Sequence, residues 1–266
     1  MLSHARCFLS RALVQNYKTK VSAETLTAIA GLDADVFGFS RPECCGPVPE
    51  GLPGSFQITD HVILNTALLP TEWAKRAQNV PHFRALQKRL QEELPSASIA
   101  VCHTPEYPAN TVLRFNLDSA ANGQCRQYTV DKDGAMELPW QMADAQCADC
   151  SAHHFVFICA HRLRDARCGY CGPVLVDVMS QEVKRAFPNL RTVHVIPCSH
   201  FGGHVYAGNV LLYSKHGGIC FGCVTPDDAE AIIDFIRQDD GIVPDALQNR
   251  VRGRMTSRSP NGPPPR

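Results

Sequence analysis

Two cysteines and two histidines stand at spacings that suit metal binding. Cys159 and Cys168 are separated by eight residues, and His200 and His204 follow about thirty residues later in the run Pro-Cys-Ser-His-Phe-Gly-Gly-His. Two thiolates and two imidazoles form a complete ligand set for a tetrahedral zinc ion or, two per iron, for a [2Fe-2S] cluster. The Gly-Gly pair between the histidines disfavours a helical arrangement of the two imidazoles, which is common in zinc sites.

The elements that must position these residues follow a regular order. The pattern of apolar residues predicts strands and helices in the order β, α, β, β, β, α, which fits a thioredoxin-like α/β layer sandwich. In this fold Cys159 ends a central strand, Cys168 lies just ahead of the following helix, and the loop 160–167 wraps an ion at the edge of the sheet. The predicted elements are strand 154–159, helix 174–187, strands 192–197, 209–213 and 218–221, and helix 226–237.

The sequence of the first half predicts a smaller, degenerate α+β domain. Its apolar patterns indicate elements of both kinds but no ligand motif, and we expect His61 and Trp73 to be core residues. The predicted elements are strands 56–64, 98–102 and 111–116 and helices 71–76 and 83–94. We therefore divide the chain into an N-terminal domain at 21–150, a thioredoxin-like domain at 151–243 and a disordered basic tail at 244–266.

Composition excludes several classes of partner. The 266 residues are 44% hydrophobic and 20% charged, as in an ordinary globular protein. The 26 basic residues balance 26 acidic ones, so no excess charge favours nucleic acid or an anionic membrane. No stretch approaches the roughly 20 apolar residues of a membrane-spanning helix, so we expect no membrane insertion.

Residues 1–20 have the composition of a mitochondrial transit peptide. They contain four lysines and arginines, several hydroxyl residues and apolar positions at helical spacing, and no acidic residue precedes Glu24. This composition predicts import into the mitochondrion, to the matrix or the intermembrane space.

The 13 cysteines allow other chemistry. No secretory signal core directs them to an oxidising compartment, so they are expected to be metal ligands, redox thiols or small buried residues. Two CxxC pairs, Cys147 with Cys150 and Cys220 with Cys223, could hold zinc with four thiolates. The first pair lies in the presumed linker and the second in a predicted strand, which weakens that interpretation.

Four further cysteines have open roles. Cys168 and Cys171 form a CxxC close to the place where thioredoxin-type folds carry a catalytic dithiol. Cys198 lies two residues before His200 and is an alternative ligand or thiol. Adjacent cysteines such as Cys44 and Cys45 bridge each other only with strain.

The two ligand motifs also carry a family resemblance. Cys-Ala-His-Arg-Leu-Arg-Asp-Ala-Arg-Cys-Gly from Cys159 and Cys-Ser-His-Phe-Gly-Gly-His-Val-Tyr-Ala-Gly-Asn from Cys198 resemble the thioredoxin-like ferredoxins labelled sucrase/ferredoxin-like. That family includes the fungal actin-patch-distal and altered-inheritance-of-mitochondria proteins. Thr-Asp-His-Val-Ile-Leu from Thr59 and Thr-Glu-Trp from Thr71 look like its N-terminal half, so the resemblance covers most of 40–240.

The resemblance implies that Cys159, Cys168, His200 and His204 hold a [2Fe-2S] cluster. Two imidazoles in place of two thiolates would raise its reduction potential. The implied function is electron transfer or mitochondrial thiol redox homeostasis, with an unidentified redox protein as partner, and a carrier of electrons is favoured over an enzyme. Two alternatives stay open: a zinc-stabilised interaction protein, and a thiol–disulfide oxidoreductase that uses Cys168 and Cys171.

Overall fold

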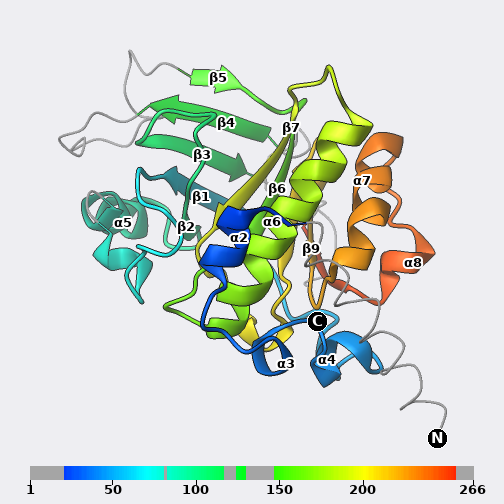
Figure 1. Ribbon diagram of the computed structural model, residues 1–266. Helices are drawn as coiled ribbons and strands as arrows, with labels where there is room; N and C mark the ends of the chain where they lie inside the picture. The colour runs from blue at the N-terminus through cyan, green and yellow to red at the C-terminus, as the bar shows by residue number, and fades with distance from the viewer. Residues whose placement is uncertain (1–20, 81–82, 117–123, 130–146, 256–266) are drawn as a thin grey trace, which may run out of the picture.

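A computed structural model describes residues 21–80, 83–116, 124–129 and 147–255 (Figure 1). The predicted transit peptide lies outside these residues. The strands are β1 (Asp60–Asn65), β2 (Ser98–Cys102), β3 (Thr111–Asn116), β4 (Gln124–Thr129), β5 (Cys147–Asp149), β6 (His154–Cys159), β7 (Val193–Cys198), β8 (Val210–Ser214), β9 (Gly217–Phe221) and β10 (Val251–Met255). The helices are α2 (Ala23–Ala28), α3 (Ala34–Phe37), α4 (Pro42–Cys45), α5 (Phe83–Glu93), α6 (Ala166–Ala186), α7 (Ala229–Gln238) and α8 (Asp245–Gln248), with short 3-10 turns η2 (Ala77–Asn79), η4 (His204–Tyr206) and η5 (Pro226–Asp228).

The strands form one mixed sheet in the order β10-β9-β8-β6-β7-β2-β1-β3-β4-β5. In the second half β6 and β7 are parallel and joined through α6, while β8 and β9 add antiparallel strands beside β6. The first half has the same plan, with β1 and β2 parallel and joined through α5 and with β3 and β4 added beside β1. This plan is that of a thioredoxin-like unit, and the predicted α/β class is confirmed.

The two halves meet at a short seam between β2 and β7. These strands are antiparallel, and their one register pair is Cys102 with Cys198. The ladder continues just beyond it, because Ser199 N donates to Val101 O at 2.7 Å and the Ser199 hydroxyl accepts from Val101 N at 3.0 Å. The seam therefore ends directly before the loop that carries His200.

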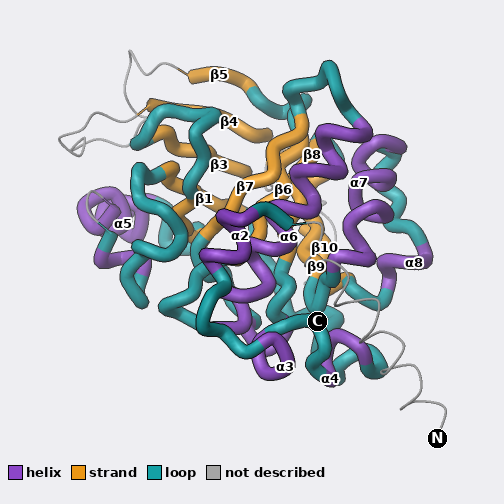
Figure 2. Tube along the Cα trace, in the orientation of Figure 1, coloured by secondary structure: helices purple, strands orange, loops and turns teal. Residues whose placement is uncertain are grey.

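The two halves of this one sheet pack face to face, and helices cover their outer faces (Figure 2). Alternate residues of a strand face opposite sides, so each half offers one face to its helices and one to the other half. Helix α5 covers the outer face of the first half, and α6 and α7 cover that of the second. The inner faces pack on one another, and the rings of Phe115 and Tyr213 stack at 4.1 Å across this interface.

Three local predictions differ from the structure. Helix α6 begins at Ala166, eight residues before the predicted start, and the segment 71–76 is a turn rather than a helix. The tail predicted from residue 244 is not wholly solvated, because α8 and β10 occupy much of 245–255 and β10 pairs with β9. Backbone pairing and the burial of Arg252 outweigh the polar composition of that segment. The boundary at residue 150 stays a prediction.

Among the described residues, no helix combines the length and the apolar composition needed to cross a bilayer.

Candidate metal centre

The first two candidate ligands come from β6 and from the first turn of α6. Cys159 is the last residue of a fully buried run in the middle of the sheet. Helix α6 is capped by Asp165, whose side chain accepts a hydrogen bond from Arg167 N at 2.9 Å. Cys168 therefore lies inside the helix and not in a loop ahead of it. Asp165 and Arg167 also form an ion pair at 2.9 Å, which fixes the side chain of the cap.

Glycine allows the helix to approach Cys159 so closely. A Cβ atom on Gly172 would lie 2.4 Å from the carbonyl oxygen of Cys159 and 2.5 Å from the Cα of Ala160. Gly169 is packed in the same way against Arg162, with 2.6 Å to its Cβ. These glycines and Pro173 are poor helix formers, which is why the start of α6 was predicted too late. Tertiary packing overrides their propensity.

The structure brings three of the four predicted ligands together. The ligand atoms of Cys159, Cys168 and His200 all lie within 4.8 Å of one another, and Cys159 Sγ is 3.8 Å from His200 Nδ1. The two thiols are buried and the imidazole is half-buried. His204 lies outside this group, on the exposed turn η4, with its ring centroid 5.5 Å from that of His200.

Backbone conformation in the second loop depends on glycine. Gly202 and Gly203 have φ values of 100° and 65°, in the left-handed region that favours residues without a Cβ. A Cβ on Gly203 would also lie 2.1 Å from Nη2 of Arg252. The Gly-Gly pair therefore keeps the two histidines off a common helix, as predicted, and also makes room for a guanidinium.

Arg252 supports this loop from a position that the sequence did not indicate. Its side chain is 1% exposed, and Nη1 donates to Asn209 Oδ1 at 2.7 Å and to Gly202 O at 3.3 Å. Asn209 in turn donates to Gly203 O at 2.9 Å. The alternation of apolar and polar residues from Val251 indicates a strand that would contain Arg252. The proline-rich sequence that follows obscures this signal.

His161 holds the loop from the other side. Its Nδ1 accepts from the backbone N–H of His200 at 3.4 Å, and its Nε2 donates to Ala74 O at 2.9 Å. The ring is 1% exposed and lies edge-on to Trp73 with centroids 5.8 Å apart. Trp73 is fully buried, as predicted. His161 thus ties the ligand loop to the N-terminal half.

The first half of the chain has an asparagine at the position that corresponds to Cys159. Asn65 ends β1 and pairs with Cys102 on β2, just as Cys159 ends β6 and pairs with Cys198 on β7. Its Nδ2 donates to Thr104 O at 3.1 Å and to Tyr107 O at 2.8 Å, and its Oδ1 accepts from Thr104 N at 2.9 Å. An amide therefore fastens the loop that corresponds to the His200 loop.

Burial favours the uncharged forms of Cys168 and His200 in the absence of a metal ion. A hydrogen bond with Cys159 and burial raise the pKa of Cys168 well above its usual value, so this thiol keeps its proton until a cation displaces it. Burial, with a smaller contribution from Arg164, lowers the pKa of His200 to about 4. At neutral pH the imidazole is therefore uncharged and has a lone pair for a metal ion.

The remaining cysteines are separated from this group. Cys198 is fully buried among the apolar residues between the two halves. Cys171 accepts a hydrogen bond from Arg41 Nη1 at 3.3 Å instead of meeting Cys168 as a dithiol. Cys220 and Cys223 lie in different apolar clusters, so this CxxC is not a joint zinc site. The side chain of Cys147, from the other CxxC, is outside the described residues.

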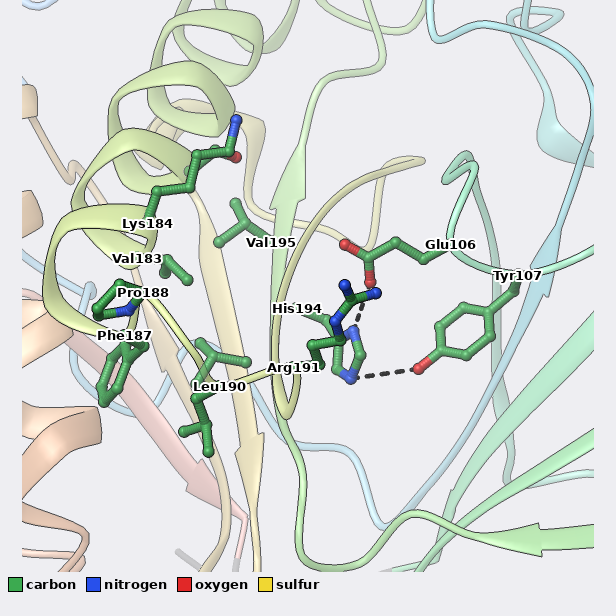
Figure 3. Close-up of a pocket in the computed structure, with 12 residues that line it drawn as sticks. Glu106, Tyr107, Val183, Lys184, Phe187, Pro188, Leu190, Arg191, His194 and Val195 are labelled. Carbon is green, nitrogen blue, oxygen red and sulfur yellow. Dashed lines mark hydrogen bonds and ion pairs between the residues drawn. The ribbon is translucent and has the colours of Figure 1, made fainter.

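A separate cavity of about 800 Å³ lies between α6, β7 and the segment that follows β2 (Figure 3). His194 Nδ1 is 2.5 Å from Glu106 Oε2, and its Nε2 is 3.3 Å from the Tyr107 hydroxyl. Lys184 and Arg191 add positive charge to a lining of mixed polar and apolar side chains. None of the four candidate ligands lines this cavity, so it is not part of the metal centre.

Fold and site together define the class: an α/β protein built of thioredoxin-like units, one of which carries a cysteine–histidine group from the ends of two central strands and the first turn of the helix between them. The family model described as sucrase/ferredoxin-like matches residues 52–253, which is more than half of the chain. The chain belongs to this family.

Curated relatives carry the name altered inheritance of mitochondria protein 32. The protein from Meyerozyma guilliermondii is 35% identical over 103 residues, which is 37% of this chain and 35% of the relative. The protein from Clavispora lusitaniae is 41% identical over 80 residues, 29% of this chain and 28% of the relative. That from Candida glabrata is 31% identical over 111 residues, 38% and 33% of the two chains. The matches thus span about a third of the relatives' length, and no solved structure matches the chain significantly.

Proposed function

We propose that this chain binds a [2Fe-2S] cluster through Cys159, Cys168, His200 and His204 and serves in electron transfer or thiol redox homeostasis. The observation that carries the proposal is the convergence of two thiols and an imidazole within 4.8 Å, from segments about 40 residues apart in sequence. The proposal is further supported by membership of a family described as ferredoxin-like.

The residues present fit such a group. Thiolate and imidazole are the donors used by mixed Cys/His iron–sulfur sites. His204 lies outside the tight group of three, with its ring centroid 5.5 Å from that of His200, and would be the fourth ligand of the set. When bound, the cluster supplies one-electron redox chemistry.

The chain's own residues set the environment. Burial of Cys159 and Cys168 excludes water from the sulfur side, while His204 on η4 is exposed to solvent. His161 holds the backbone of His200 by a hydrogen bond and thereby limits movement of the ligand loop. Because imidazole can carry a titratable proton, we expect electron uptake to depend on pH.

Zinc is the second candidate, and one distance favours it. A separation of 3.8 Å between Cys159 Sγ and His200 Nδ1 is close to that of two ligands on one tetrahedral ion, about 3.5 Å from the usual bond lengths. A zinc-stabilised interaction protein would need the same residues. The dithiol alternative with Cys168 and Cys171 lacks such support, because the Cys171 thiol faces Arg41.

We propose that the protein works in the mitochondrion with a redox protein as partner. The names of the relatives associate those proteins with mitochondrial inheritance, and together with the family they fit a mitochondrial redox-related protein. The basic composition of residues 1–20, free of acidic residues, supports import.

The test is the visible absorption of anaerobically purified protein, with its iron, sulfide and zinc content. We expect charge-transfer absorption with two irons and two sulfides per chain. Cys159→Ser and Cys168→Ser should abolish it, while His200→Cys and His204→Cys should keep the cluster and lower its potential; Cys102→Ser, a buried thiol outside the site, is the control. A colourless protein with one zinc per chain would refute the cluster.

A further inference from the structure

A second group of thiols surrounds a buried arginine beyond the metal centre. Arg41 precedes α4 and is 4% exposed. Its Nη2 donates to Cys44 Sγ at 3.1 Å and to Ala207 O at 2.8 Å. Its Nη1 donates to Phe37 O at 2.7 Å, to Gly38 O at 2.8 Å and to Cys171 Sγ at 3.3 Å. The guanidinium is thus held rigidly by carbonyl groups and points at sulfur.

Cys44 is in contact with a second thiol, that of Cys223. The two share a small buried cluster with Leu52, and each thiol shifts the pKa of the other. Cys223 has a φ of 54°, a left-handed conformation that costs a residue with a Cβ about 1 kcal/mol or more. Glycine would adopt this conformation without strain. The backbone therefore gives no reason for a cysteine at position 223, whereas the thiol side chain does.

Charge distinguishes the two thiols. The hydrogen bond from Cys223, together with Arg41 and Arg250, lowers the pKa of Cys44 against the effect of burial and of Glu43. The hydrogen bond to Cys44 and burial raise the pKa of Cys223. Arg250 itself pairs with Asp228 at 3.3 Å, and Glu43 lies 3.9 Å from Arg41 Nε. Direct contact with the guanidinium favours the thiolate form at Cys44 over Cys223 and makes Cys44 the better nucleophile of the pair.

Access also differs between the two. Cys44 is 5% exposed and lies in the four-residue helix α4, which is followed by the exposed residues Gly46, Pro47 and Val48. Cys223 has no exposed surface. Movement of this single short turn would expose Cys44 to a small reagent first and leave Cys223 to react with it internally.

We propose that Cys44 and Cys223 form a redox-active dithiol that exchanges with small disulfides of the glutathione type, with Arg41 holding the attacking sulfur. The Cys44 thiolate attacks one sulfur of the small disulfide, forms a mixed disulfide and releases one small thiolate, which takes the proton of Cys223. The Cys223 sulfur then attacks that of Cys44, forms the internal disulfide and releases the second small thiolate, which is protonated from water. Two protein thiols are oxidised and one small disulfide is reduced to two thiols.

This activity goes beyond the proposed function, because it uses none of the four candidate ligands. It is linked to them through Arg41, which also binds the backbone at Ala207 beside Cys159 and Cys168, and through Cys223 N, which donates to Tyr206 O on η4 at 3.0 Å. Zinc in place of iron at the metal centre would leave the dithiol intact, so the two proposals can fail separately.

The experiment equilibrates the purified full-length protein in glutathione buffers of increasing oxidation, blocks free thiols by alkylation and maps the peptides by mass spectrometry, while visible absorption and metal content are followed in parallel. We expect a Cys44–Cys223 linked peptide that forms in one reversible transition. Cys44→Ser and Cys223→Ser should abolish it, and Cys102→Ser should not change it. Arg41→Met should slow its formation roughly three- to fourfold for each pKa unit that Cys44 regains, because the greater nucleophilicity of a more basic thiolate offsets part of the loss in thiolate fraction. Arg41→Lys should restore part of the rate.

The wild-type peptide map decides the matter even if a variant fails to fold. A bridge from Cys44 to Cys45 or Cys171 in place of Cys223, or free thiols at both Cys44 and Cys223 in the most oxidising buffer, would overturn the proposal.

Discussion

Acid should destabilise this protein through a histidine that lies between the two halves. His61 is fully buried on the inner face of β1, and its Nδ1 is 2.8 Å from the Tyr213 hydroxyl on β8. Its Nε2 has no hydrogen-bond partner among the described residues. Burial lowers the pKa of His61 to about 3. Protonation would therefore place an unpaired charge in the apolar core that joins the halves.

The magnitude follows from the difference between folded and unfolded chains. The unfolded chain binds the proton below pH 6.5, whereas the folded chain does not bind it until about pH 3. The contribution of His61 is present in full above pH 6.5 and is lost as the pH falls through this window, by about 1.4 kcal/mol per pH unit. We expect a loss of about 2 kcal/mol at pH 5 and about 3 kcal/mol at pH 4.

The assay is urea unfolding followed by circular dichroism at several pH values between 7 and 4. His61→Gln keeps a polar partner for Tyr213 but cannot titrate. As the pH falls, the unfolding free energy of the wild type should therefore drop below that of the variant by those amounts, relative to their difference at pH 7. Tyr213→Phe removes the partner without removing the titrating group and should retain the wild-type slope. Equal slopes for wild type and His61→Gln would refute the reasoning.

Three further variants test the packing around the metal centre and around the corresponding loop of the first half. Gly172→Ala should reduce bound metal severalfold, because the added methyl lies 2.4 Å from Cys159 O; Ser180→Ala, on the same helix, is the control, and equal metal content in both would contradict the argument. Arg252→Met should lower the unfolding free energy by about 2–4 kcal/mol, since it leaves buried groups such as Asn209 Oδ1 without a donor; a change below about 0.5 kcal/mol in urea titrations speaks against this role. Asn65→Ala should cost about 1–3 kcal/mol and leave metal content unchanged, so a loss of metal would show that the first loop also supports the centre.

Much of the sheet could be predicted from apolar patterns. The predicted bounds of β2, β3 and β6 match the structure residue for residue, because short runs of apolar and β-branched residues between turns give a clear signal. The start of α6 could not be predicted, because Gly169 and Gly172 allow close packing at the cost of helix propensity and Pro173 disfavours a helix interior. Local sequence indicates propensity, whereas close approach between segments depends on the fold.

The candidate site likewise has a part that the sequence predicts and a part that only the fold reveals. Cys159, Cys168 and His200 could be assigned to one group because each follows or precedes a recognisable element. Arg252 and Arg41 could not be linked to their sites, since the contacts join residues as far apart as Arg41 and Cys171, which are 130 positions from each other. The similarity of the two halves was also hidden, because it lies in strand order and direction and not in repeated residues.

Comparison of Asn65 with Cys159 indicates that a bound metal would also have a structural role. Asn65 closes its loop with hydrogen bonds that form as the chain folds, so that half needs no ligand to be complete. At the corresponding place the second half has Cys159, whose side chain makes no such set of bonds to the loop. Arg252 and His161 hold that loop from its two sides, and a link from Cys159 to the neighbouring ligands would need a bound ion. A bound metal would act there as a reversible crosslink beside the seam between the halves. Its loss should loosen one end of the molecule while the other keeps its shape, and amide hydrogen exchange would record the two loops as unlike.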